Sequence, residues 1–159
     1  AMDFLIRDAV PDDAEAISHV RVEGWRESYA HILSAGFLAA LDASAQVERW
    51  RESIASGRTI VVAEVHGNVR GFAISGPART ENSPHDLELQ AIYQLAKMHG
   101  SGSGQALLDA SIGNQPAYLW VAELNPRAIA FYRKNGFRAD GERMISPEWE
   151  NLVEIRMAR

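Results

Sequence analysis

The spacing of apolar residues predicts helices in the first third of the chain. Apolar positions recur with a helical period over 14–29, directly after Pro11-Asp12-Asp13, a proline and two acidic residues typical of a helix start. A second helical stretch is expected over 35–54, with a break near residues 42–44, where Ser44 is the expected cap of the second part. A short alternating strand over 4–7 precedes both helical stretches.

In the middle of the chain, the pattern of apolar residues changes from a helical period to one typical of strands. The β-branched run over 59–65 predicts a strand, His66-Gly67-Asn68 predicts a hairpin turn, and 69–74 is the expected returning strand. After a polar loop over 77–84, a further strand is expected over 87–95. The middle of the chain is therefore rich in strands.

Helices and strands alternate in the last third. Asn125 and Pro126 mark one helix start, because Asn is a good N-cap and Pro is favoured at the first helical position. The expected elements are helices over 105–112 and 125–135 and strands over 118–122, 137–145 and 152–157. The whole order predicts an α/β fold with a mixed sheet of about seven strands flanked by helices.

Length and composition narrow the class of protein. A chain of 159 residues suits one domain, taken here as 2–159, and its 47% hydrophobic share is sufficient for a sizeable core. No cysteine is present, which excludes disulfides, thiol nucleophiles and cysteine-ligated metals. A net charge of −5 argues against a nucleic-acid partner, and the five histidines are not at metal-ligand spacing, so no metal is expected.

Targeting and membrane signals are absent from the sequence. No apolar run approaches the ~18–20 residues that cross a bilayer. The first residues also lack the basic-then-apolar pattern of an export signal. We expect a cytoplasmic protein without a membrane partner.

The most informative segment is a glycine-rich turn, His99-Gly100-Ser101-Gly102-Ser103-Gly104, between a predicted strand and a predicted helix. Glycines let the backbone approach a ligand closely, and the N–H groups of the turn and of the new helix converge on one point, where they can bind phosphate. A flexible linker is the alternative, but the glycine-serine run is short and lies inside one domain.

Two other phosphate-binding motifs fit this turn less well. A nucleotide P-loop ends in Gly-Lys-Ser/Thr, whereas Gly104 is followed by Gln105. A dinucleotide-binding fingerprint has G-x-G-x-x-G after the first strand of a βαβ unit, whereas this turn is G-x-G-x-G and comes late in the chain. A phosphate-bearing cofactor held by backbone groups is the preferred interpretation.

Two blocks of sequence resemble the GCN5-related N-acetyltransferase (GNAT) family. One is the glycine-rich turn followed by Gln105-Ala106-Leu107-Leu108, which is similar to the family's pyrophosphate-binding motif, Gln/Arg-x-x-Gly-x-Gly/Ala. The other resembles the family's strand, Asn-x-x-Ala-x-x-Phe-Tyr and Gly-Phe pattern, and comprises Leu119-Trp120-Val121, Asn125, Ala128, Phe131-Tyr132 and Asn135-Gly136-Phe137. The resemblance covers most of the chain and is strongest over 86–138.

The resemblance implies a single-domain GNAT fold with a mostly antiparallel sheet, and acetyl-CoA as the cofactor. It implies oxyanion and pantetheine contacts from the main chain of Ile92 and Gln94, beside a bulge that splays their strand from the next. The chain departs from the family at His99, where Arg or Gln is usual, and at Ala96, where many members carry Pro. The residues implied to contact coenzyme A are Ile92, Tyr93, Gln94, His99, Gly100, Ser101, Gly102, Ser103, Gly104, Gln105, Asn125, Ala128, Phe131, Tyr132 and Lys134.

Acetyl transfer to an amine needs a neutral amine, donors for an oxyanion and a proton for the leaving thiolate. Glu88 lies on a largely apolar strand, where a carboxylate is costly unless it faces solvent or a cleft, and the resemblance implies that it is the base, directly or through water. The alternative is a solvated Glu88 paired with a basic neighbour. Tyr132 matches the family's usual general acid, and its alternative is a core aromatic.

Residues of the first helix are candidates for the acceptor side. Trp25 and Tyr29 are four apart and share a helix face, so they either wall the substrate pocket, as the resemblance implies, or pack in the core. Arg21 and Arg79 are among the nearby charges that could select a substrate. The sequence does not choose between these roles.

We therefore expect an acetyl-CoA-dependent N-acetyltransferase that acts on a primary amine of a small molecule, such as an amino acid or an analogue. Direct transfer would use Glu88 as base and Tyr132 as acid. A protein or peptide N-acetyltransferase and a catalytically silent acyl-CoA-binding sensor are the alternatives. A homodimer is compatible with related folds, although no exposed apolar stripe requires one.

Overall fold

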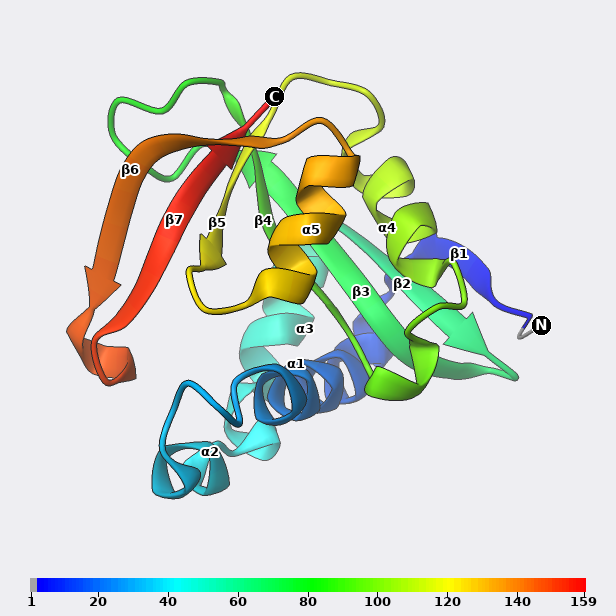
Figure 1. The fold of residues 1–159 in the computed structure, drawn as a ribbon. Coiled ribbons are helices and arrows are strands. Elements are labelled where there is room, and N and C mark those ends of the chain that lie inside the picture. Colours follow the sequence, from blue (N-terminus) through cyan, green and yellow to red (C-terminus); the bar gives the residue numbers. More distant parts are fainter. Residues whose placement is uncertain (1–2) are drawn as a thin grey trace.

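A single seven-stranded sheet forms the centre of the computed structural model, which describes residues 3–159. The strand order is β1-β2-β3-β4-β5-β7-β6, and only β4 and β5 are parallel neighbours (Figure 1). The strands are β1 Leu5–Asp8, β2 Thr59–Val65, β3 Asn68–Pro77, β4 Leu87–Gln94, β5 Tyr118–Ala122, β6 Arg138–Ser146 and β7 Leu152–Ala158. The predicted single-domain α/β class with a mixed, mostly antiparallel sheet is confirmed.

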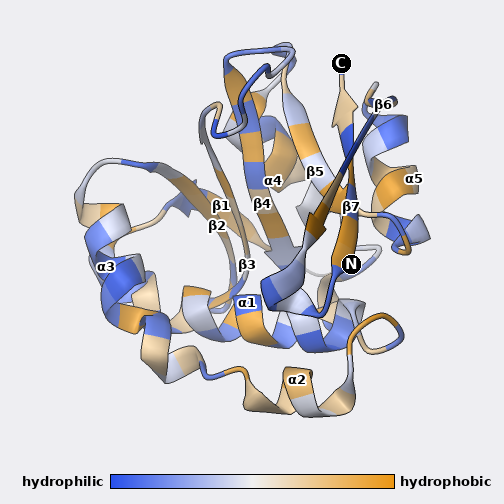
Figure 2. Cartoon of the chain, turned by 90° about the vertical axis from the view of Figure 1, so that its left-hand side faces the viewer, coloured by the Kyte–Doolittle hydropathy of each residue, from blue (hydrophilic) through white to orange (hydrophobic). Residues whose placement is uncertain are grey.

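Helices cover both faces of the sheet. Figure 2 shows α3 and α5 on opposite sides of the strands, with α1 running along one end. The helices are α1 Ala14–Ser28, α2 Ala35–Ala40, α3 Val47–Ala55, α4 Ser103–Ile112 and α5 Pro126–Lys134. We call the side covered by α1 and α3 the α1 face, and the side covered by α4 and α5 the α4 face. Residue 2, the predicted start of the domain, lies outside the described residues.

Buried apolar residues fill the space on each face. On the α4 face, Leu108 and Ile112 of α4 pack with Leu89, Leu119 and Phe137. The α1 face has its own core, which includes Ile17, Val20, Val62, Phe72 and Ile74. β2 and β3 are apolar over nearly continuous runs rather than at alternate positions, as expected for strands that are covered on both faces.

Side chains cap two of the helical segments between β1 and β2. Ser34 caps α2 by accepting a hydrogen bond from the Phe37 N–H at 3.1 Å. The predicted cap at Ser44 is wrong: Asp42 caps the following 3₁₀ turn and accepts hydrogen bonds from the Ser44 N–H and hydroxyl. Asp is as good a cap as Ser, and it stands two residues earlier, where the chain is still extended.

The sheet is irregular where β4 meets its two neighbours. Ile74 pairs with Ala91 and Ser75 pairs with Leu89, so Gln90 is an extra residue in β4, which is a β-bulge. On the other side, β4 and β5 are paired only at Glu88 and Tyr118. The two strands therefore separate beyond this pair, and the bulge that the resemblance implied is present. Within residues 3–159, no helix is long and apolar enough to span a membrane.

The α4-face core generates a stability prediction. Leu108 is fully buried, so Leu108→Ala leaves a cavity and we expect it to lower the free energy of unfolding by about 2–5 kcal/mol. Leu124→Ala is the control, because this leucine is 61% exposed and its truncation should change stability by less than about 0.5 kcal/mol. Urea denaturation measures both, and equal losses would contradict this account of the core.

Candidate active site

A cleft of about 960 Å³ opens where β4 and β5 separate. It is lined by residues of β4, β5, β7, the glycine-rich turn and α5, and by side chains of α1. The cleft therefore passes from the α4 face, through the gap in the sheet, to the α1 face. A ligand in it can contact both faces at once.

The edge of β4 offers unpaired main-chain groups to this gap. The Leu95 N–H donates to the Arg70 carbonyl at 3.0 Å, which makes this pair a hydrogen-bonded one. Antiparallel strands alternate hydrogen-bonded and non-hydrogen-bonded pairs, so Tyr93 bonds to β3 while Ile92 and Gln94 direct their main-chain groups away from it. The groups of Ile92 and Gln94 thus face the gap, where β5 makes no pair with them.

The glycine-rich turn is held in a fixed shape by its own residues. Gly100 and Gly102 have φ of 80° and 91°, values that glycine adopts without steric strain. The Ser101 hydroxyl lies 2.6 Å from the Met98 carbonyl and 2.9 Å from the Ser103 hydroxyl. Ser103 in turn donates to the Gln94 side chain at 2.6 Å, which connects the turn to the end of β4.

Four lining residues of this turn present free amides. Within residues 3–159, no acceptor bonds to the main-chain N–H of Gly100, Gly102, Gly104 or Gln105, and all four residues line the cleft. Two of these amides belong to the first turn of α4, where the helix dipole is positive. The arrangement suits an anion such as a diphosphate.

Three basic residues line the same cleft as these amides. His99 is the first residue of the glycine-rich turn, while Arg127 and Lys134 are exposed on α5. Burial lowers the pKa of His99, the positive charge of Arg127 lowers it further, and Glu27 opposes both effects. His99 is therefore largely neutral at pH 7 and becomes a cation only in more acidic solution.

Tyr132 reaches the cleft from α5. Asn125 caps this helix by accepting from the Ala128 N–H at 3.2 Å, and Tyr132 lies about two turns later. The ring packs against Phe131 and Phe137, and burial raises the pKa of the phenol, so the hydroxyl stays protonated at pH 7. Within the described residues this hydroxyl has no hydrogen-bond partner, although Tyr132 lines the cleft.

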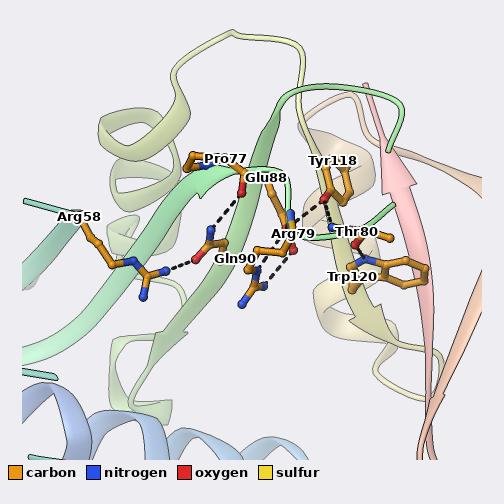
Figure 3. A network of polar contacts seen from close by, with 8 residues as sticks. All are labelled: Arg58, Pro77, Arg79, Thr80, Glu88, Gln90, Tyr118 and Trp120. Atoms are coloured by element: carbon orange, nitrogen blue, oxygen red, sulfur yellow. Dashed lines mark hydrogen bonds and ion pairs between the residues drawn. The ribbon is translucent and has the colours of Figure 1, made fainter. Parts of the chain in front are cut away.

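Glu88 is buried on the α1 face and bonded to several donors (Figure 3). It accepts hydrogen bonds from the Arg79 main-chain N–H and guanidinium, the shortest at 2.9 Å, and from the Tyr118 hydroxyl at 3.0 Å. Thr80 extends this network, because its N–H lies 3.3 Å from the Tyr118 hydroxyl and its side chain accepts from Trp120 at 3.0 Å. The network fastens the loop between β3 and β4 to the sheet.

Aromatic rings line the α1-face half of the cleft. Trp25 and Tyr29 form an edge-to-face pair with centroids 4.9 Å apart, and Trp25 forms a second such pair with Trp149 at 5.1 Å. The Trp25 indole N–H donates to the Tyr93 hydroxyl at 2.9 Å. Trp25 and Tyr29 are buried and also line the cleft, so they belong both to the core and to its wall.

Comparisons with known proteins agree with this geometry. A family model described as the acetyltransferase (GNAT) domain matches residues 56–139. The N-acetyltransferase YuaI of Bacillus subtilis (strain 168) is 34% identical over 167 residues, which covers 95% of each chain. The chain belongs to the GNAT acetyltransferase family. It is therefore an acyltransferase of the N-acetyltransferase type.

Solved structures share the GNAT fold. The PaiA N-acetyltransferase of Thermoplasma acidophilum, in complex with coenzyme A, superimposes with a TM-score of 0.73 at 19% identity and covers 99% of this chain and 100% of its own. YncA of Salmonella typhimurium, described with its cofactor acetyl-CoA, has a TM-score of 0.70 at 20% identity and covers 99% and 93% of the two chains. At this identity the likeness concerns the fold alone.

The cleft of this GNAT acetyltransferase contains most residues that the sequence singled out. Ser101 and Ser103 do not line it and instead shape the turn. The lining residues are Trp25, Tyr29, Glu88, Ile92, Tyr93, Gln94, His99, Gly100, Gly102, Gly104, Gln105, Asn125, Ala128, Phe131, Tyr132 and Lys134. Their individual roles stay predictions.

Sequence reasoning missed other residues of the GNAT cleft. Arg127 could have been found from its position in the first turn of a helix. A positive charge there interacts unfavourably with the helix dipole, which indicates a role other than stabilising the helix. Glu154 could not, because alternation with Val153 and Ile155 makes its side of the strand resemble a solvent face. Trp120 stands in the second resembling block but was not singled out as a site residue, and Trp149 carried no local signal.

The electrostatics of His99 generate a prediction. We expect its pKa to lie below the ordinary value of 6.5, and Arg127→Ala should raise it, because a nearby positive charge disfavours the imidazolium. Arg133→Ala, a charge removal from the same helix, should leave it unchanged. NMR titration of the His99 imidazole measures this pKa in the wild type and in both variants. An equal shift in the two variants would contradict the assignment of Arg127 as the charge that acts on His99.

Proposed function

We propose that the chain transfers the acetyl group of acetyl-CoA to a primary amine of a small molecule that resembles an amino acid. The observation that carries this proposal is the row of four free amides at the glycine-rich turn, beside the gap between β4 and β5. The PaiA and YncA structures, described with coenzyme A and acetyl-CoA, support the same cofactor here.

The residues of the cleft fit coenzyme A in two places. The free amides of Gly100, Gly102, Gly104 and Gln105 suit its diphosphate, with Arg127 and Lys134 as cations for further phosphate charge. The main-chain groups along β4 suit the amides of its pantetheine arm, which can pair like an added strand. Acetyl-CoA supplies the acyl group as an activated thioester.

Tyr132 is the proposed general acid. Its protonated hydroxyl lines the cleft and is free of protein partners within residues 3–159, so it can give a proton to a departing sulfur. The main-chain N–H groups along β4 at Ile92 and Gln94 are suited to stabilise negative charge on an acyl oxygen.

The α1-face half of the cleft is the proposed acceptor pocket, and its arginines favour an anionic group on the acceptor. Arg21 lies over the Trp25 ring at 4.9 Å, and Arg58 bonds to the Gln90 amide. Neither arginine forms an ion pair within residues 3–159, although both line the cleft. A carboxylate beside the reacting amine would be a suitable partner for either of them.

An acceptor panel tests the proposed function. Purified protein, acetyl-CoA and a set of free amino acids, simple amines and peptides are combined, and free thiol is measured. We expect turnover with small amines that carry a carboxylate. Turnover only with peptides would favour the peptide N-acetyltransferase, and coenzyme A binding without any turnover would favour the silent sensor.

The glycine-rich turn generates a binding prediction. Gly102→Val should weaken coenzyme A binding at least about tenfold, because a β-branched residue is strained at a φ of 91° and crowds the path of the diphosphate. Gly67→Val is the matched control, since Gly67 has a φ of 80° and open space around it but lies in the β2–β3 hairpin, outside the cleft. Calorimetric titration with coenzyme A measures both variants. An unchanged Kd in Gly102→Val would contradict diphosphate binding by the glycine-rich turn.

Tyr132 generates a kinetic prediction. Tyr132→Phe removes only the hydroxyl, so we expect kcat to fall by about 10²–10⁴-fold while the Kd for coenzyme A changes less than about threefold. The ring contacts with Phe131 and Phe137 remain, which should preserve thermal stability. A variant as fast as the wild type would remove Tyr132 as the acid.

A further inference from the structure

A second carboxylate of the cleft, Glu154, has none of the partners that hold Glu88. It lies in the middle of β7, two residues after Leu152, which packs on the α1 face with Trp25. Ile155 packs on the α4 face, so alternation along the strand places Glu154 on the α1 face. Glu154 also lines the cleft, on the side of the proposed acceptor pocket.

The contrast with Glu88 is in hydrogen bonding. Glu88 accepts from Arg79 and Tyr118, which occupy both of its oxygens. Within residues 3–159, Glu154 takes part in no side-chain hydrogen bond and no ion pair. A partly buried carboxylate without donors is costly, and such a group in a cleft is poised for a cationic ligand.

The surroundings of Glu154 leave room for that ligand. Its cross-strand neighbours are Ala122 on β5 and Met144 on β6, and neither carries a charge. Ala122 is small and belongs to the same core cluster as Trp25, and Trp25 and Tyr29 line the same cleft as Glu154. An ammonium group in this space would meet a carboxylate and aromatic faces, the combination that binds organic cations.

Charges that face Glu154 from other elements act in opposite directions. Burial raises the pKa of Glu154, Arg79 lowers it, and Glu88 raises it again. The phenols of Tyr29, directly after α1, and Tyr93 on β4 also face it and are neutral at pH 7, because burial raises the pKa of each. Arg156, on the same strand face, is bound to Asp140 at 2.6 Å.

We infer that Glu154 binds the ammonium group of the acceptor and takes its proton, as the catalytic base of this acetyltransferase. This inference rests on the proposed function and replaces Glu88 in the role that the resemblance implied for it. Glu88, held by Arg79 and Tyr118, is then a positioning residue that fastens the loop over the pocket. The acceptor class is a primary amine that is cationic in solution.

The proton and electron balance of the step is complete with residues of this chain. Glu154 takes one proton from the ammonium, and the freed nitrogen lone pair forms the bond to the acyl carbon. The carbon–sulfur bond breaks with its electron pair on sulfur, which receives the proton of Tyr132. The second nitrogen proton restores the Tyr132 phenol, and Glu154 releases its proton to water, so the net reaction yields amide, free thiol and one proton.

The test compares Glu154→Gln with Glu88→Gln and Glu142→Gln in the full chain. Glu142 is an exposed residue of β6 and serves as the control for loss of one negative charge. We expect kcat/KM of Glu154→Gln at pH 7 to be lower than wild type by about 10²–10⁴-fold, with unchanged Kd for coenzyme A. The difference should narrow as the pH approaches the pKa of the amine, near ~10 for a lysine-like group, because a neutral amine needs no base.

The stability of the variants separates a base from a structural residue. Because the pKa of Glu154 is raised in the folded protein, its ionised form opposes folding at neutral pH, so Glu154→Gln should melt at the same temperature as wild type or higher. Glu88→Gln breaks a buried ion pair and should melt lower. A wild-type rate in Glu154→Gln, or a loss that is the same at every pH, would overturn the inference.

Failure of the inference is distinguishable from failure of the proposed function. If the wild-type protein releases thiol with an amine and Glu154→Gln does so equally fast, only the role of Glu154 is wrong. If Glu88→Gln shows the pH-dependent loss instead, the base is Glu88. Absence of thiol release by the wild-type protein with every amine would contradict the proposed function and the role of Glu154 together.

Discussion

The site depends on the separation of two parallel strands that share only the pair Glu88–Tyr118. Unpaired main-chain N–H and C=O groups are costly in an interior, so such a gap persists only where water or a ligand reaches it. In this protein the gap opens into the cleft and places free groups of Ile92 and Gln94 close to the glycine-rich turn. Main-chain groups can therefore hold a long, charged ligand with little help from side chains.

The two faces of the sheet contribute different chemistry to the cleft. The α4 face supplies backbone donors and the phenol of Tyr132, while the α1 face supplies aromatic rings, arginines and the carboxylates of Glu88 and Glu154. The carboxylates differ in state because their partners differ: Glu88 is saturated by donors, whereas Glu154 is not. One residue type thus serves as a structural anchor in one place and as a reactive group in another.

The sequence predicts the fold better than the chemistry of the acceptor pocket. Periodicity and local start and stop residues locate helices and strands, and the glycine-rich turn is readable because positive φ and free amides are local properties. Asp42 and Ser44 are both good capping residues, and the sequence does not show that the extended segment ends at Asp42, which therefore is the cap. The environment of Glu154 arises from β4, β7 and α1, which are far apart in sequence, so no local pattern could contain it.

The bulge at Gln90 sets which side of the sheet each later residue of β4 faces. Leu89 and Ile92 pack on the α4 face and Ala91 and Tyr93 on the α1 face, an assignment that an uninterrupted strand would invert beyond Leu89. Tyr93 would then leave Trp25 and enter the cofactor side. The number of residues between Leu89 and Gln94 is therefore fixed. An insertion or deletion of one residue there would turn side chains of the acceptor pocket toward the cofactor side, and side chains of the cofactor side toward the acceptor pocket.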